Sequence, residues 1–363
     1  MVAILPVDLG NRSYDIMIGP GLLEQAGALI AQQVGMQRAL LVSNPLVFSL
    51  YGEKVLQSMD EQGMTVTVAL MPDGERFKNI KEAMKVLDQA VRAGLERFSP
   101  VIALGGGVVG DLAGFVSAIY QRGTPLVQIP TTLLAQVDSS VGGKVAVNHR
   151  QGKNLIGAFH QPRLVLIDTC TLNTLTPRDY RSGLGEVVKY GMAFDAELFS
   201  YIEQHSGPII QRSSPVLAWL IECCCRLKSQ IVARDEHEQG LRMSLNLGHT
   251  FGHALEKLGH YNEYTHGEAV VMGTMAAACL ACHLGLLAAD ELMRLNNLYD
   301  RLGLRSRFPD YSPAAVYRLM QKDKKVSQGK MRLILPEGIG NFAIRDDVSR
   351  QTILQAINMA RDK

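Results

Sequence analysis

The sequence has almost no excess of charge of either sign, which limits the partners that its surface can attract. Among 363 residues, 37 are Lys or Arg and 35 are Asp or Glu, so the formal net charge is +2. Nucleic acids and anionic membranes bind proteins largely through an excess of positive charge. The composition therefore argues against both partners. A small anionic ligand would need a local cluster of cations.

Cysteine is also scarce. The chain has 6 cysteines, of which Cys223, Cys224 and Cys225 are consecutive, and so few cannot form a disulfide-stabilised scaffold. The first residues lack the basic stretch and the long apolar stretch of a secretory leader. We therefore expect a cytoplasmic protein with reduced thiols.

Long, strongly apolar runs are missing too. A membrane-spanning helix needs about 20 such residues, whereas the longest uncharged apolar stretch, residues 269–289, is rich in alanine and contains His283. We interpret this stretch as a helix buried in the protein. Cys279 and Cys282 within it form a C-x-x-C pair that has no second pair, which indicates small-residue packing rather than a metal site.

The pattern of apolar residues changes halfway along the chain. The first half alternates short strands with helices: strands at 14–18, 39–43, 64–71, 101–104, 126–129 and 164–167, and helices at 45–61, 81–93 and 108–120. The second half predicts long helices at 182–194, 196–204, 214–235, 247–258, 268–284 and 289–302, then a strand at 331–336 that pairs with 340–344. Alternation of this kind is typical of a parallel sheet covered on both faces.

We therefore predict two domains of different class. Residues 1–172 are expected to form a Rossmann-like α/β domain, and residues 173–363 a mostly α-helical domain. Ligands often bind between two domains, so the active site is expected in the cleft between them.

A glycine-rich turn follows the predicted strand at 101–104. Gly105, Gly107 and Gly110 fit the pattern G-x-G-x-x-G between a strand and a helix, where backbone amides can approach a pyrophosphate. However, the turn follows a late strand, and no acidic residue lies about 20 positions on to bind a ribose. A nucleotide in another arrangement and a tight turn without a ligand both stay open.

Residues 138–144, with the sequence DSSVGGK, combine an acid, two hydroxyls and a lysine with glycines. The segment resembles a phosphate-binding Walker loop, but Asp138 stands where the first glycine belongs, and Val145 replaces the Ser or Thr. It is therefore not a Walker loop. A binding segment and a solvated loop are the two alternatives.

Three histidines fall close together in the helical half. His249, His253 and His266 lie within 18 residues, and the first two share a face of a helix because they are four residues apart. Imidazoles with a carboxylate suit zinc, so the cluster predicts a divalent metal site. The motif H-E-x-x-H is absent, so the carboxylate must come from elsewhere, with Glu186 as the candidate. Alternatively, Glu186 and Lys189 form an ordinary exposed helix pair.

Together these motifs resemble one family, the 3-dehydroquinate synthases. In chain order the matching segments are PDGERFK, GGGVVGDLAGF, IPTTLLAQVDSSVGGKVAVN, KNLIGAF, GEVVKYG, DEHEQGLRMSLNLGHTFGHALE, THGEAV and DKKV. The resemblance implies a lyase of the shikimate pathway that converts 3-deoxy-D-arabino-heptulosonate 7-phosphate to 3-dehydroquinate and phosphate. It implies transient oxidation at C5 by NAD, β-elimination of phosphate, re-reduction, ring opening and an intramolecular aldol closure. Another sugar-phosphate cyclase, or a polyol dehydrogenase of the same superfamily, is the alternative.

The resemblance also implies roles for individual residues. Zinc, or cobalt, would be held by Glu186, His249 and His266, and His253 would contact substrate instead of metal. The implied NAD contacts are Glu75, Lys78, Gly105, Gly106, Gly107, Val108, Gly110, Asp111, Thr131, Thr132, Lys144 and Lys153. The implied substrate and catalytic contacts are Asp138, Lys144, Asn154, Lys189, Lys228, Arg242, Asn246, His253 and either Lys325 or Lys324. Arg122 resembles an arginine that reaches the neighbouring subunit's site, so we expect a homodimer.

Overall fold

The structure is a computed structural model that describes residues 2–35, 38–321, 326–327 and 330–361. The predicted substrate contacts Lys324 and Lys325 lie outside the described residues. The chain divides into two compact units: one holds Met1–Leu175 and Leu217–His237, and the other holds Thr176–Val216 and Glu238–Lys363.

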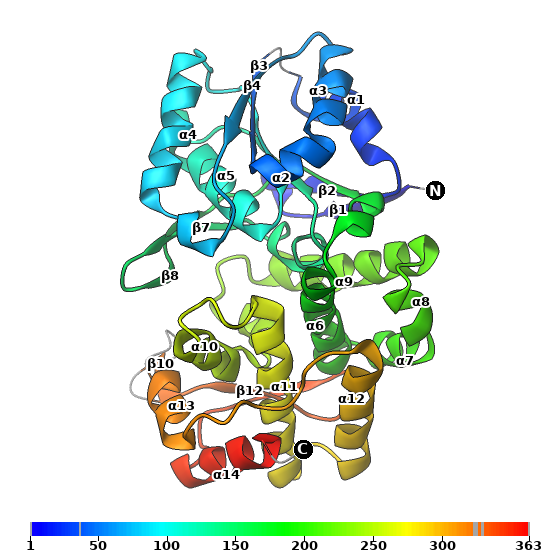
Figure 1. The fold of residues 1–363 in the computed structure, drawn as a ribbon, viewed down its shortest axis with the longest axis vertical. Helices are drawn as coiled ribbons and strands as arrows, with labels where there is room; N and C mark the ends of the chain where they lie inside the picture. The colour runs from blue at the N-terminus through cyan, green and yellow to red at the C-terminus, as the bar shows by residue number, and fades with distance from the viewer. Residues whose placement is uncertain (1, 36–37, 322–325, 328–329, 362–363) are drawn as a thin grey trace. The chain divides into compact units, whose positions relative to one another are not determined.

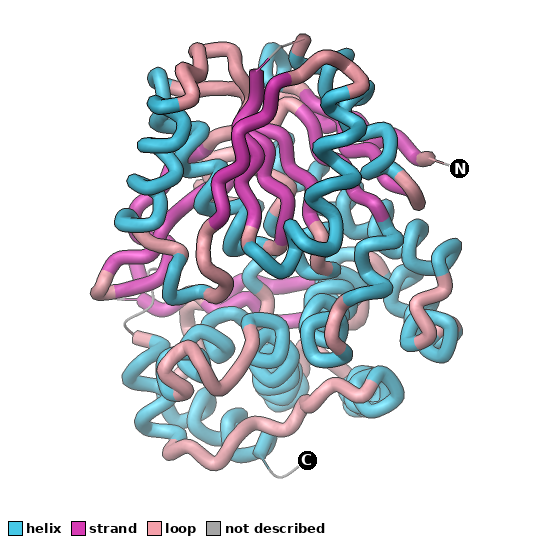
Figure 2. Tube along the Cα trace, turned by 45° about the horizontal axis from the view of Figure 1, so that its top comes forward, coloured by secondary structure: helices cyan, strands magenta, loops and turns pink. Residues whose placement is uncertain are grey.

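The first unit is built on a seven-stranded sheet in the order β1-β2-β9-β6-β5-β3-β4. Its strands are β1 (Ala3–Val7), β2 (Tyr14–Gly19), β3 (Arg38–Ser43), β4 (Thr65–Leu70), β5 (Val101–Gly105), β6 (Leu126–Pro130) and β9 (Leu164–Asp168). Neighbouring strands are parallel, except that β1 pairs antiparallel with β2 at one edge. The predicted parallel sheet is confirmed, and Figure 2 shows it as a magenta layer between helices. The edge strand β1 was not predicted.

Helices cover both faces of this sheet. Alternate residues of β3 point to opposite faces: Leu40 packs in the core beneath α4 (Ile80–Arg92) and α5 (Gly107–Ile119), while Leu41 packs beneath α1 (Ala26–Val34) and α3 (Glu53–Asp60). All residues of β5, β6 and β9 are buried. Two-sided burial explains why these strands are continuous apolar runs in the sequence.

Two local differences from the sequence prediction occur in this unit. The predicted helix at 45–61 is interrupted: α2 (Pro45–Val47) and α3 are joined by a wider helical turn at Phe48–Gly52. In addition, an unpredicted antiparallel hairpin forms from β7 (Lys144–His149) and β8 (Gly152–Phe159). Residues 138–144 run from the helical turn Ala135–Ser139 into this hairpin, so they are not merely a solvated loop.

The second unit is mostly helical, as predicted. Its helices are α6 (Pro177–Phe194), α7 (Ala196–Gln204), α8 (Ser206–Ile210), α10 (His249–Leu258), α11 (His266–His283), α12 (Ala289–Leu302), α13 (Pro313–Met320) and α14 (Arg350–Arg361). Two short strands, β12 (Leu333–Pro336) and β13 (Phe342–Arg345), pair antiparallel, which confirms the predicted pairing. Figure 1 shows these elements in green to red.

Helix α11 contains the apolar stretch noted in the sequence. Its residues 269–281 are all buried, which confirms a core helix. Within the described part of the chain, no helix is long and apolar enough to cross a membrane.

Helix α9 (Ser214–Arg234) belongs mostly to the first unit, because Leu217–His237 group with it. Within that unit the Cys225 thiol donates a hydrogen bond to the Gln136 carbonyl at 3.2 Å. The helical period of the sequence predicts this helix but not its neighbours. The domain boundary at residue 172 stays a prediction, since grouping by contacts does not show which part folds independently.

Candidate metal and cofactor sites

Three separate helices of the second unit bring Glu186, His249 and His266 together. Glu186 lies midway along α6, while His249 and His266 are the first residues of α10 and α11. Each of the two histidines is placed by the start of its helix. The Thr265 side chain caps α11 in a reciprocal arrangement with Glu268, and Gly248 precedes α10 with a left-handed φ of 76°.

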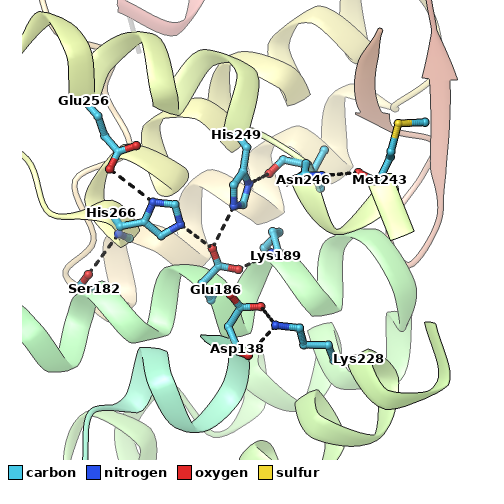
Figure 3. Close-up of polar contacts among 12 residues, drawn as sticks. Asp138, Ser182, Glu186, Lys189, Lys228, Met243, Asn246, His249, Glu256 and His266 are labelled. Carbon is cyan, nitrogen blue, oxygen red and sulfur yellow. Dashed lines mark hydrogen bonds and ion pairs between the residues drawn. The ribbon is translucent and has the colours of Figure 1, made fainter. Parts of the chain in front are cut away.

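The ligand atoms of these residues form a compact group. One oxygen or nitrogen from each lies within 4.8 Å of the others, and both imidazole Nε2 atoms are 3.6 Å from Glu186 Oε1. Figure 3 shows the two rings facing the carboxylate. Glu186 is fully buried, so its charge needs cationic partners inside the protein. Two imidazoles and one carboxylate fit a divalent ion with an open coordination position.

The remaining ring nitrogens are oriented by neighbouring groups. His249 Nδ1 is 3.1 Å from the Leu247 carbonyl oxygen, and His266 Nδ1 is 3.5 Å from Glu256 Oε1. Such outer partners fix the orientation of metal-binding histidines. Glu256 is buried and was missed by the sequence prediction, although its place one helical turn after His253 was a usable signal.

The same carboxylates control the charge of His266. Burial lowers the pKa of His266, but Glu186 and Glu256 outweigh burial and raise this pKa to about 10. A divalent ion at this position would replace that proton as the positive charge between the two carboxylates.

His253 lies beside the group without joining it. Its ring centroid is 5.5 Å from that of His249 and 6.3 Å from that of His266. Spacing alone paired His249 with His253, whereas the structure brings His249 together with His266. Helical spacing could not show this because the start of α11 is placed by tertiary packing.

Lys189 is also buried, one turn after Glu186 on α6, and forms an ion pair with it. An ordinary exposed helix pair is therefore the wrong interpretation. Arg242 is buried in the short helical segment Leu241–Asn246, and Asn246 Nδ2 donates hydrogen bonds to Glu238 Oε1 and the Met243 carbonyl oxygen, both at 3.1 Å. Arg242 and Asn246, both predicted substrate contacts, lie shortly before His249 in the chain.

The first unit places two other predicted substrate contacts together. Lys228 Nζ of α9 is 2.8 Å from Asp138 Oδ1, and it also bonds the Asp138 carbonyl oxygen. Lys228 is buried, so Asp138 supplies the negative partner that its positive charge needs inside the protein.

The glycine-rich turn joins β5 to α5 in the first unit. Gly106 precedes α5 without any side chain capping the helix, so the first-turn amides are available to an anion. A Cβ at Gly106 would lie 3.0 Å from Thr132 Cγ2, and one at Gly110 would lie 2.8 Å from Gln128 Oε1. These glycines therefore also permit close packing, as a tight turn requires. Thr131 supports the same turn by donating its N–H to the Gly105 carbonyl at 3.0 Å.

Three predicted cofactor contacts form a charged cluster beside the turn. Lys78 Nζ is 2.8 Å from Asp111 Oδ2 and 3.2 Å from Glu75 Oε1. Burial lowers the pKa of Lys78, but the two carboxylates outweigh burial and hold this pKa above its ordinary value. Lys78 thus joins the segment at 72–78 to helix α5 through Asp111.

The other predicted contacts are on exposed or partly exposed segments of the first unit. Lys144, Lys153 and Asn154 lie on the β7–β8 hairpin, and Asn154 has a left-handed φ of 53°. Arg122 is exposed after α5, also with a positive φ, of 64°.

Comparison with known proteins identifies the family. Two family models match: 3-dehydroquinate synthase N-terminal over residues 68–182 and 3-dehydroquinate synthase C-terminal over residues 183–326. The 3-dehydroquinate synthase of Pelotomaculum thermopropionicum is 49% identical over 353 residues, which are 97% of this chain and 95% of that protein. The chain belongs to the 3-dehydroquinate synthase family.

Two of the solved structures similar to this family member are synthases determined with NAD+ and a divalent metal ion. The 2-epi-5-epi-valiolone synthase of Streptomyces hygroscopicus, determined with NAD+ and Zn2+ bound, has a TM-score of 0.89 and 31% identity, covering 98% of both chains. A 2-deoxy-scyllo-inosose synthase, determined with carbaglucose-6-phosphate, NAD+ and Co2+, has a TM-score of 0.88, covering 98% of this chain and 100% of its own. At 24% identity, the second structure shows a shared fold only.

Proposed function

We propose that this protein is a 3-dehydroquinate synthase, a carbon–oxygen lyase that converts 3-deoxy-D-arabino-heptulosonate 7-phosphate to 3-dehydroquinate and phosphate. The observation that carries the proposal is family membership over nearly the whole chain, together with the Glu186–His249–His266 group. Cations that suit a substrate with one carboxylate and one phosphate are present in both units.

The proposed cofactors are NAD and a divalent ion, zinc or cobalt. The bound NAD+ and Zn2+ of the valiolone synthase support both assignments. Glu186, His249 and His266 would hold the ion, and the glycine turn with Glu75, Lys78 and Asp111 would hold NAD. When bound, NAD supplies a transient hydride acceptor for C5, and the ion supplies Lewis-acid polarisation of substrate hydroxyl oxygens.

The protein's own residues would bind and orient the substrate. Arg242 can bind both oxygens of the carboxylate with its planar guanidinium, and Lys228 adds a second cation. Lys144, Asn154 and His253 suit the phosphate. Because the leaving phosphate can itself take the C6 proton, no strongly basic side chain is required. Lys189, which pairs with the buried Glu186, would keep a proton near the hydroxyl oxygens of the substrate.

We also propose a cytoplasmic homodimer in which Arg122 of one subunit contributes to the site of the other. The exposure of Arg122 after α5 supports this role.

One experiment tests the proposed activity. The zinc-loaded protein is incubated with the heptulosonate phosphate and a catalytic amount of NAD, and released phosphate and dehydroquinate are measured. We expect both products in equal amounts without net NADH. Phosphate release only from another sugar phosphate would indicate a related cyclase, and growth of NADH absorbance with a simple polyol would indicate a dehydrogenase. The variant His249→Ala should lose the metal and the turnover while keeping the fold.

A further inference from the structure

Asn148 occupies an irregular position on the β7–β8 hairpin. The pairing between these strands shifts register between Val147 and His149, so Asn148 lies at the irregularity. Its backbone pairs instead with the segment that carries Glu75 and Lys78: the Asn148 N–H donates to the Lys78 carbonyl oxygen at 2.7 Å, and Asn148 forms an isolated parallel bridge with Asn79. A β-bulge of this kind re-aims a side chain out of the regular alternation.

The side chain of Asn148 uses both ends of its amide. Nδ2 donates to Glu75 Oε1 at 2.7 Å and to the Glu75 carbonyl oxygen at 3.2 Å. Oδ1 accepts the backbone N–H of Asn154 at 2.9 Å. The chemistry fixes this orientation, because a carboxylate can only accept and a backbone N–H can only donate.

Each partner of Asn148 needs such support. Asn154 has a left-handed backbone with φ of 53°, a conformation that residues with a Cβ adopt rarely, and the Asn148 side-chain carbonyl accepts its N–H. Glu75 is one of two carboxylates beside Lys78, and the Asn148 amide donates to the same oxygen, Oε1, that pairs with the lysine.

We propose that Asn148 is a positioning residue that holds the cofactor-side carboxylate Glu75 and the substrate-side residue Asn154 in a fixed relation. The connection runs from Asn154 through Asn148 to Glu75, and from there through Lys78 to Asp111 of α5. The roles of Glu75 and Asn154 rest on the proposed function, whereas the contacts that join them are those of the structure.

The decisive variant is Asn148→Asp, which keeps the shape and replaces the donor with a second carboxylate oxygen facing Glu75. Two facing carboxylates repel, so the Asp variant should bind NAD about 10-fold more weakly than the wild type at pH 8. Protonation restores a donor toward Glu75, and the remaining oxygen still accepts from Asn154. NAD affinity of this variant should therefore recover as the pH falls toward 5.5. The variant Asn148→Ala should bind NAD weakly at both pH values.

The measurement is NAD affinity of the zinc-loaded protein by calorimetry at both pH values, without substrate, beside kcat and KM for the heptulosonate phosphate. Arg150→Ala, an exposed change in the turn of the same hairpin, is the matched control and should behave as the wild type. Thermal melting shows whether each variant is folded. An Asp variant whose NAD affinity does not depend on pH, or an Ala variant with wild-type affinity and KM, would overturn the proposal. Wild-type protein that binds NAD but makes no dehydroquinate would overturn the proposed function alone.

Discussion

At the scale of single residues, the predicted metal ligands are positioned by residues to which the sequence analysis gave no role. Glu256 faces His266 Nδ1, and Leu247 faces His249 Nδ1 through its carbonyl. Sequence analysis predicts the groups that carry chemistry because their types and spacing are unusual. It gave Glu256 no role, because the ring that Glu256 contacts, that of His266, begins another helix, and spacing within α10 does not reveal that contact.

We predict that Glu256→Ala weakens zinc binding about 10- to 100-fold, the usual effect of removing an outer partner of a metal-binding histidine. Without the carboxylate, the His266 ring loses the contact that orients its Nε2 toward Glu186. Competition with a chromophoric chelator measures the affinity. Glu256→Gln keeps an acceptor oxygen and should retain more affinity than Glu256→Ala. Equal affinity in both variants and the wild type would show that Glu256 has no part in the site.

A second prediction concerns His160 in the first unit. Its Nε2 is 2.9 Å from the Thr124 carbonyl oxygen and 3.1 Å from Ser117 Oγ. Burial lowers the pKa of His160 below its ordinary 6.5, and Arg163 adds to this, although the Thr124 carbonyl opposes it. The unfolded chain therefore binds more protons than the folded one once the pH falls below about 6.5, and stability is lost on acidification.

The check compares urea unfolding of wild type and His160→Gln at pH 7 and pH 5.5. The glutamine amide can still donate to the Thr124 carbonyl but does not titrate. We expect the variant to lose less stability than the wild type over this interval. The same loss in both proteins would assign the acid sensitivity to other groups.

At the scale of elements, the sequence predicted best where burial is two-sided. The strands β5, β6 and β9 and the helix α11 are buried along most of their length, so each is visible in the sequence as a nearly continuous apolar run. The edge strand β1 is short and contains Pro6, and its residues are mostly not buried. The hairpin β7–β8 is largely exposed and carries charged and polar residues, so neither stands out as a buried apolar strand. Helical periodicity could not predict that His249 lies beside His266, because the two residues begin different helices.

The start of α10 gives a prediction about one glycine. Gly248 has φ of 76°, and a Cβ there would lie 2.5 Å from the Thr274 backbone nitrogen. Gly285 has φ of 73° with no atom within 4 Å of such a Cβ. Gly285→Ala is thus the matched control, which meets only the left-handed backbone cost of about 1–2 kcal/mol.

Gly248→Ala should lose more stability than Gly285→Ala and, unlike it, should weaken zinc binding. The clash displaces the chain directly before His249. Urea unfolding gives the free energies, and chelator competition gives the affinities. If both variants bound zinc as tightly as the wild type, the backbone at Gly248 would not be placing His249.

At the scale of the whole molecule, the near balance of 37 basic and 35 acidic residues describes the surface rather than the sites. Lys78, Lys189, Lys228 and Arg242 are buried beside their own partners or segments. The sequence predicted the two structural classes correctly because periodicity changes along the chain. It could not show that α9 groups with the first unit, since helical periodicity carries no information on which surface a helix packs against.

Metal binding should stabilise the whole molecule. A ligand that binds only the folded state adds about 2.7 kcal/mol at 100 times its Kd. We therefore expect zinc to raise the melting temperature of the metal-stripped wild type and to leave His249→Ala unchanged. Differential scanning calorimetry with and without zinc measures this. An equal shift in the variant would place the ion elsewhere.

Residues Leu217–His237 belong to the first unit, although they follow a segment of the second unit in the chain. This arrangement affects the order of folding during synthesis. A ribosome that has released residues up to 175 has delivered the complete sheet, but not the helix that supplies Cys225 to Gln136 and Lys228 to Asp138. The nascent sheet must therefore wait for some 60 further residues before this part of its surface is covered. Until then the surface that α9 covers stays exposed, and chaperones bind chains in such incompletely packed states.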